Sequence, residues 1–168
     1  MPSSATLLRL QFDYNVWADQ RLLAAAGELS RDELNRDFGT ADKSVLGTLV
    51  HVFGAERLWL GRFQREANPL YLAPADYHFS VLQNDWPSLH HRWRSWLDGL
   101  SDDFVAADFD YHDLKGHAWR QPLWQLVLHA VNHGTHHRGQ VAGFLRTLGH
   151  VPPPLDITVY YRQTNPAP

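Results

Sequence analysis

Cysteine is absent from the 168 residues of the chain, and methionine occurs only once. Without thiols the chain can form no disulfides, and any metal ion must be held by nitrogen and oxygen ligands. Hydrophobic residues make up 44% of the chain and charged residues 20%, which is typical of a globular protein. The length suits one domain that buries its own core, so we expect a single soluble domain over residues 1–168.

Long apolar runs and blocks of positive charge are also missing. No uninterrupted stretch of about 18 apolar residues occurs, so the sequence predicts no membrane span. Arg9, Gln11 and Asp13 interrupt the apolar N-terminal run, so we expect no signal peptide and a cytoplasmic location. The chain has a net charge of −3 and no block of basic residues that could neutralise phosphates. The sequence therefore argues against a nucleic-acid partner.

Apolar residues recur at three- and four-residue steps in four long segments, which predicts an all-α four-helix bundle. The third helix has an ambiguous start. Ser80 and Gln83 could form a capping box, but Pro87 is favoured only in a first turn, which places the start near Asn84. The expected helices are residues 7–29, 44–66, about 84–100 and 122–148.

The connections carry weaker patterns. Residues 31–43 read as a polar connection in which Asp42 or Ser44 caps the second helix. Residues 108–121 alternate aromatic and polar side chains, which predicts a short β-hairpin before the last helix. Residues 155–161 are expected to be extended. Residues 90–94 are expected to form a solvated face of the third helix.

Histidine is abundant, with 11 residues, and four lie within residues 127–141 of the last expected helix. Histidines four residues apart lie one turn apart on one helix face and can reach a common ion. At about 100° per residue, His133 and His137 fall within the apolar stripe of this helix. Three further polar residues lie at the edge of the stripe: His129, His136 and Gln140.

Two readings of this pair remain open. Buried imidazoles need partners, because an unpaired buried polar group costs about 1–3 kcal/mol. A metal ion would satisfy both His133 and His137, and a hydrogen-bonded pair of core histidines would do so equally. A third ligand could come from His51 in the second helix. The sequence is equally compatible with His51 being a lone structural histidine. His51 shares a stripe with Gly47 and Gly54, so this helix is expected to be covered on two sides, as a central element or by an extra partner.

Four segments carry a resemblance to a known family: YNVWADQRLL (14–23), LVHVFGAERLWLGR (49–62), HAVNHGTHHRGQV (129–141) and PPLDITVYY (153–161). Over nearly its whole length the chain resembles the DinB family, also described as DinB/YfiT-like metalloenzymes. The resemblance implies a four-helix bundle, often a homodimer, with a metal ion held by three histidines. Carried onto this sequence, those ligands are His51, His133 and His137. The family name refers to damage-inducible expression, which implies a role in the stress response and no binding of DNA.

The resemblance also bears on chemistry. Some related members are thiol S-transferases or isomerases that use a low-molecular-weight thiol, and many others have no known substrate. We therefore expect a divalent-metal protein, with Zn or Ni the first choices and Co, Fe or Cu also compatible with imidazole ligands. A metal-dependent transferase or hydrolase acting on a small molecule fits this site. The alternative is a non-enzymatic stress-response protein whose ion is structural.

Other polar residues in the helices have simpler explanations. His129 and His136 are expected to be hydrogen-bonding or exposed residues and not further ligands. Gln140 could orient a ligand. Glu56, on the apolar side of the second helix, is expected to form an ion pair inside the bundle, and Asn15 a cap or an interhelical hydrogen bond.

Overall fold

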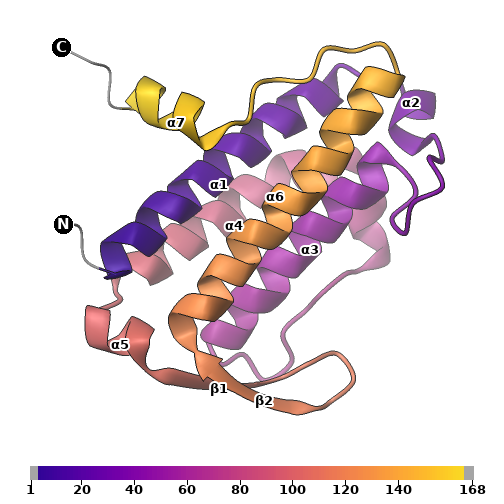
Figure 1. The fold of residues 1–168 in the computed structure, drawn as a ribbon. Coiled ribbons are helices and arrows are strands. Elements are labelled where there is room, and N and C mark those ends of the chain that lie inside the picture. The colour runs from indigo at the N-terminus through magenta and orange to yellow at the C-terminus, as the bar shows by residue number, and fades with distance from the viewer. Residues whose placement is uncertain (1–3, 165–168) are drawn as a thin grey trace.

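The structure is a computed structural model, which describes residues 4–164. Four long helices form the bundle: α1 (Ser4–Gly27), α3 (Val45–Phe63), α4 (Phe79–Asp98) and α6 (Leu123–Thr147), as Figure 1 shows. Helix α6 packs against α1 and α3, and α4 packs against the same two helices from the opposite side. The expected all-α four-helix bundle is confirmed. None of these helices is long and apolar enough to cross a membrane, within the part of the chain described.

The connection between α3 and α4 is long because these two helices run in the same direction (Figure 1). Residues 64–78 therefore return along the side of the bundle, and they contain the short 3₁₀ helix η1 (Pro74–Tyr77). On this path the backbone of Tyr71 comes close to Gly54 of α3, whose added Cβ would lie 2.9 Å from the Tyr71 carbonyl oxygen. The connection thus covers one face of α3.

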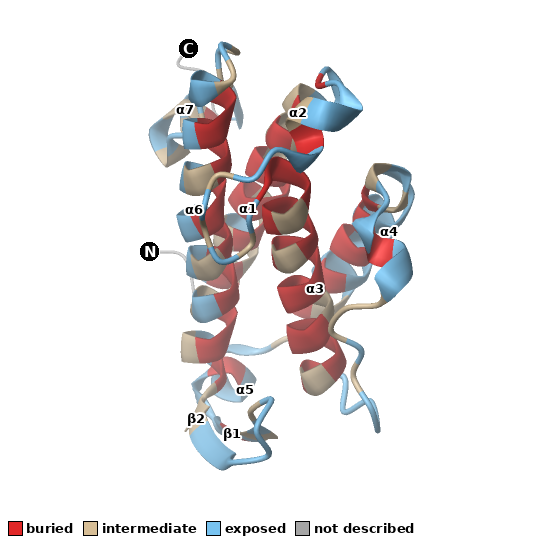
Figure 2. Ribbon diagram, turned by 90° about the vertical axis from the view of Figure 1, so that its right-hand side faces the viewer, coloured by how far each residue is buried: buried red, intermediate tan, exposed pale blue. Residues whose placement is uncertain are grey.

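Helix α3 is the most buried of the four long helices. Of its 19 residues, 15 are buried, and Figure 2 shows this burial along nearly the whole helix. Its neighbours are α4, α6, η1 and the short helix α2 (Arg31–Asn35), all from the same chain. The expectation that this helix is covered on two sides is confirmed, and intramolecular packing supplies the cover.

The helix ends follow familiar capping rules. Ser44 caps α3, since its Oγ accepts a hydrogen bond of 3.0 Å from the Gly47 N–H. At the other end of the chain, α6 stops before Gly149, which has a φ of +89°. The N–H of His150 then reaches back to the Leu145 carbonyl at 2.9 Å, the hydrogen-bond pattern of a glycine-terminated helix. Asp42, the other candidate cap, is left available for the site described below.

The predicted hairpin is present. Strands β1 (Asp108–His112) and β2 (Ala118–Pro122) pair antiparallel, with Tyr111 opposite Trp119. The turn contains Gly116 at a φ of +85°, a conformation that glycine adopts without a steric penalty. A short helix, α5 (Asp102–Ala106), precedes the hairpin, and α6 begins directly after it.

The expected start of the third helix is wrong. Helix α4 begins at Phe79, and Pro87 lies inside it and not in its first turn. An interior proline costs about 3 kcal/mol. Leu82 and Trp86 lie before Pro87 and are almost fully buried, at 0% and 1% exposure. Burying each such side chain contributes about 1.5–3 kcal/mol, which offsets the proline.

Two expected irregular segments are partly helical. The polar connection over residues 31–43 begins with α2, which Ser30 and Glu33 close with a reciprocal capping box. The tail expected to be extended forms α7 (Ile157–Thr164). Tyr160 of α7 packs against Tyr14 and Trp17 of α1, with ring centroids 5.9 and 5.6 Å apart. This docking outweighs the strand preference of the β-branched and aromatic residues in the tail.

Candidate metal centre

Three histidines from two helices converge between α3 and α6. The Nε2 atoms of His51 and His133 are 2.9 Å apart. His137 lies one turn beyond His133, and its ring centroid is 4.4 Å from that of His51. One ring nitrogen from each histidine lies within 4.8 Å of the others. Imidazole nitrogens at about 2.0–2.1 Å from a tetrahedral ion would be about 3.3 Å apart, so small side-chain adjustments would accommodate an ion.

The surroundings keep the imidazoles of His133 and His137 in the neutral form that binds metals. Burial, together with the charges that His137 and His51 would carry, lowers the pKa of His133 to about 3. Burial likewise lowers the pKa of His137, against the opposing effect of its hydrogen bond to Gln140. A neutral imidazole has a free lone pair, which is the state that a metal ligand requires.

The outer nitrogens of two histidines are held by hydrogen bonds. The Nδ1 of His51 lies 2.7 Å from the hydroxyl of Tyr71, and the Nδ1 of His137 lies 2.8 Å from Oε1 of Gln140. Asp42 lies between them, with carboxylate oxygens 3.7 and 3.8 Å from the same two nitrogens. Since the outer nitrogens face these partners, the Nε2 atoms are left for the centre of the cluster.

Sequence reasoning found only part of this surrounding shell. Gln140 does orient His137, in keeping with the sequence-based expectation that it could orient a ligand. From the sequence Asp42 fits a helix cap, and Tyr71 lies in a proline-containing connection without periodicity, so no sequence pattern identifies either residue as a partner of the histidines. His129 and His136 do not belong to the three-residue group among the residues that the structure describes. The ring of His129 lies against Trp59, and His136 is exposed beside His137.

A second cluster of donors lies deeper in the bundle. Asp19 of α1, Glu56 of α3 and His90 of α4 are 1–3% exposed, and one donor atom of each lies within 4.8 Å of the others. The Nε2 of His90 is 3.5 Å from Asp19 and 3.2 Å from Glu56. The expectation that residues 90–94 form a solvated face is therefore wrong for His90. His90 shares the buried face of α4 with Trp86 and Trp93, one turn on either side.

Hydrogen bonds from three helices occupy the two carboxylates. The amide of Asn15 donates to Asp19 at 2.9 Å and to Glu56 at 2.6 Å. Trp86 Nε1 donates to Glu56 at 2.8 Å, and Arg138 of α6 donates to Asp19 at 2.8 Å. Arg138 also donates to the side-chain Oδ1 of Asn15 at 2.6 Å. The expected interhelical role of Asn15 and the burial of Glu56 in an ionic network are both observed.

Charge balance explains why such a cluster can be buried. Burial alone would lower the pKa of His90, but the carboxylates of Asp19 and Glu56 raise it to about 9. Burial would raise the pKa of Asp19, yet Arg138 and His90 lower it. The pKa of Glu56 is raised by burial and by the charge of Asp19. With His90 and Arg138 as cations, two positive charges face two carboxylates, so the charges of the cluster balance one another.

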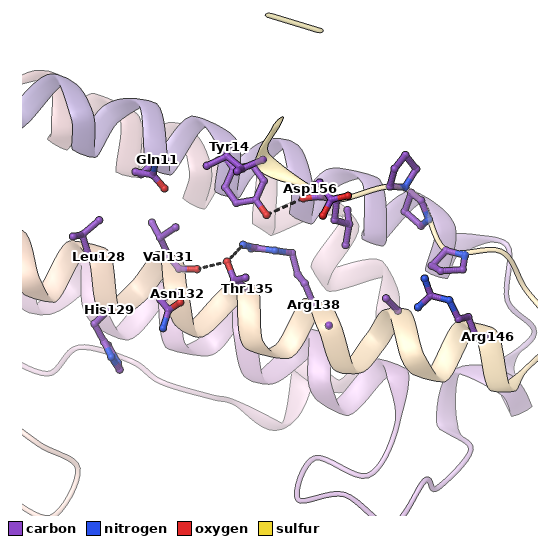
Figure 3. A pocket seen from close by; sticks show the side chains of 17 residues that line it. Gln11, Tyr14, Leu128, His129, Val131, Asn132, Thr135, Arg138, Arg146 and Asp156 are labelled. Atoms are coloured by element: carbon purple, nitrogen blue, oxygen red, sulfur yellow. Dashed lines mark hydrogen bonds between the residues drawn. The ribbon is translucent and has the colours of Figure 1, made fainter. Parts of the chain in front are cut away.

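A groove lies elsewhere, along α1 and α6 beneath the chain that leads to α7 (Figure 3). Its volume is about 1130 Å³, and none of the three converging histidines lines it. Tyr14 closes one wall through a 2.9 Å hydrogen bond to the Leu155 carbonyl. The groove and the histidine cluster therefore lie at different places in the bundle. The candidate metal centre is identified by its three histidines and not by a groove.

Fold and cluster together define a helical bundle that presents three histidines from two adjacent helices. The model of the DinB family matches residues 1–167, and the chain belongs to this family. The chain is also 23% identical over 161 residues to Protein DinB of Bacillus subtilis (strain 168). That similarity covers 91% of this chain and 92% of the relative.

The buried network predicts opposite effects for two glycine substitutions in α6. A Cβ at Gly134 would lie 2.7 Å from Arg138 Nη1 and 2.8 Å from Asn15 Oδ1, whereas a Cβ at Gly139 meets nothing within 4 Å. Gly134→Ala should lower the free energy of unfolding by about 1–3 kcal/mol. Gly139→Ala, the matched control, should raise it by about 0.4–1 kcal/mol. Urea denaturation measures both, and equal effects would contradict the tight packing around Arg138.

His90 predicts a loss of stability at alkaline pH. Its pKa rises from 6.5 to about 9 on folding, so its stabilising contribution is complete below about pH 6.5 and is lost as pH rises through about 9. Between pH 6.5 and 9.5 the wild type should lose about 1–3 kcal/mol more than His90→Gln. Denaturation across this range tests the difference. His91→Gln, at the exposed neighbour, should follow the wild type, and parallel curves for wild type and His90→Gln would exclude a buried imidazolium.

Proposed function

We propose that the chain binds one divalent transition-metal ion through His51, His133 and His137. The single observation that carries this proposal is the convergence of three imidazoles from α3 and α6, with donor nitrogens within 4.8 Å of one another. The fit rests on the donor chemistry: neutral imidazoles suit Zn and Ni, and also Co, Fe and Cu. The family membership of the chain supports the same ligand set.

We further propose that the ion serves a metal-dependent enzyme of the thiol S-transferase or hydrolase type. Three protein ligands leave coordination positions for water or a small molecule. The side chain of His51 is 24% exposed and that of His137 11%, so the cluster can be reached from solvent. When bound, the ion would supply Lewis acidity and lower the pKa of a coordinated water or thiol. Burial keeps His133 and His137 neutral, and the hydrogen bonds to Tyr71 and Gln140 orient the rings of His51 and His137.

The metal assignment predicts a sharp division among the histidines. His51→Ala, His133→Ala and His137→Ala each remove one of three protein ligands, so the metal content of the purified protein should fall from about one ion per chain to near zero. His129→Ala and His136→Ala should lower affinity by at most about 10–100-fold and keep the ion when metal is plentiful. Mass-spectrometric metal counting after growth with Zn and Ni measures this. A metal-free wild type, or loss of the ion from His129→Ala but not from His133→Ala, would refute the assignment.

The enzymatic role has a separate test. The zinc-loaded protein, a low-molecular-weight thiol and an electrophilic acceptor should give thioether product, and His133→Ala should give none. A zinc-loaded protein that turns over neither this pair nor a panel of small esters and amides, while zinc raises its melting temperature, would favour a structural ion.

We also propose that a second copy of this chain is its partner. The support is an exposed apolar face near the N-terminal ends of α1 and α6, where Leu7 is 48% and Trp124 is 41% exposed and both side chains line one pocket. Such a face can pack against the same face of a second copy. Light scattering at micromolar concentration should give about twice the chain mass of 19.3 kDa. A species of one chain mass at all concentrations tested would exclude the dimer.

A further inference from the structure

The connection between α3 and α4 contributes a residue to the metal centre. Tyr71 lies in this connection, and its hydroxyl is 2.7 Å from Nδ1 of His51. The two rings meet edge to face, at 87° and a centroid separation of 6.2 Å. The opposite nitrogen of His51, Nε2, faces His133. Tyr71 therefore contacts the nitrogen of His51 that points away from the cluster.

The backbone of Tyr71 is fixed to α3 by a side chain of that helix. Arg57 donates two hydrogen bonds to the Tyr71 carbonyl oxygen, at 2.6 Å from Nη2 and 3.2 Å from Nε. The same guanidinium pairs with Asp76 through Nη2 at 2.5 Å and Nη1 at 3.3 Å. Arg57 thus holds residues 69–76, called the strap below, at two points.

Asp76 closes the strap on itself. Its Oδ2 accepts a 2.6 Å hydrogen bond from the Ala73 N–H, and the residue is only 3% exposed. Burial would raise the pKa of Asp76, but the hydrogen bonds from Arg57 and Ala73 lower it, so the carboxylate stays charged. Charge-assisted hydrogen bonds of this kind are about twice as strong as neutral ones.

Helix α3 has a matching surface under the strap. His51, Gly54 and Arg57 are spaced three residues apart and lie on one side of the helix. A Cβ on Gly54 would clash with the side chain of Leu72 and would lie 2.9 Å from the Tyr71 carbonyl oxygen. Only glycine allows the strap to lie this close. Each of the three residues of α3 thus contacts a different part of Tyr71. His51 contacts its hydroxyl, Gly54 leaves room for its backbone, and Arg57 donates to its carbonyl oxygen.

We propose that Tyr71 is a positioning residue of the metal centre and that the strap exists to hold it there. Its hydroxyl accepts a hydrogen bond from Nδ1–H of His51, which selects the tautomer whose Nε2 lone pair faces His133 and His137. Partners of this kind fix the ring orientation of metal-binding histidines and raise their affinity for the ion. Asp42 is 3.7 Å from the same nitrogen, too far for a direct hydrogen bond. The inference rests on the proposed metal site.

A pair of conservative substitutions tests this role. Tyr71→Phe removes only the hydroxyl, and Tyr77→Phe is the matched control in η1, where Tyr77 is 51% exposed. Zinc affinity, measured by competition with a chromophoric chelator, should fall about 10–100-fold in Tyr71→Phe and stay unchanged in Tyr77→Phe. The melting temperature of the metal-free protein should be similar in both variants, because the ring and the Arg57 contacts remain.

The tautomer gives a readout independent of metal binding. In the metal-free wild type, ¹⁵N chemical shifts should show His51 protonated at Nδ1, whereas Tyr71→Phe should show a mixture of the two tautomers. Gly54→Ala keeps the hydroxyl but displaces the strap, so it should also lower zinc affinity. A wild type that binds zinc while Tyr71→Phe binds it equally tightly, or a His51 tautomer unaffected by Tyr71→Phe, would overturn the positioning role and leave the metal site intact. A wild type that binds no zinc would instead overturn the proposed function.

Discussion

Four charges enclosed between four helices constrain the whole bundle. Asp19, Glu56, His90 and Arg138 come from α1, α3, α4 and α6, one from each long helix, and all are at most 3% exposed. Isolated buried charges cost several kcal/mol each, so the cluster is tolerated only when every helix contributes its member in register. Apolar side chains could pack in several ways with similar energy, whereas ion pairs at these distances form only when the helices carrying them are aligned. The cluster therefore specifies how the helices align.

The candidate metal centre depends on that alignment. Glu56 lies on α3 between one and two turns from His51, and Arg138 directly follows His137 on α6. The ionic cluster holds α3 and α6 together close to the histidines. The position of one helix along the axis of the other is therefore already set where the imidazoles meet. The hydrogen bonds at Nδ1 of His51 and Nδ1 of His137 then fix how each ring is rotated about its side-chain bonds. Backbone alignment and ring orientation are thus controlled by different residues.

Much of this architecture follows from the sequence. Apolar periodicity identifies α1, α3 and α6 and the approximate end of α4, and the alternating pattern before Pro122 identifies the hairpin. The spacing of His133 and His137 places both on one face of α6, while the resemblance to the DinB family supplied His51. These features are local, or are shared by relatives, and they can be seen without knowing the packing.

The remaining features depend on contacts between distant parts of the chain. Pro87 suggests a helix start, but the burial of Leu82 and Trp86 extends α4 past it. His90 and His91 are identical in type and adjacent in sequence, and only the docking of α4 decides that His90 faces two carboxylates. Tyr71 reaches His51 because the strap runs back along α3, and no periodicity encodes the course of an irregular segment. These features depend on how distant segments pack against one another, which the local sequence patterns do not encode.

The ionic cluster also has a consequence for the order in which the chain can fold. Arg138 joins Asn15 and Asp19 across 123 and 119 residues, so the cluster closes only when α6 docks on α1. An intermediate containing α1, α3 and α4 alone would bury two carboxylates with one imidazolium and no guanidinium, which is electrostatically unfavourable. In such an intermediate the carboxylates would stay exposed to water until α6 docks. During synthesis the first 120 or so residues would therefore wait for α6, and consolidation of the core would be a single late cooperative step.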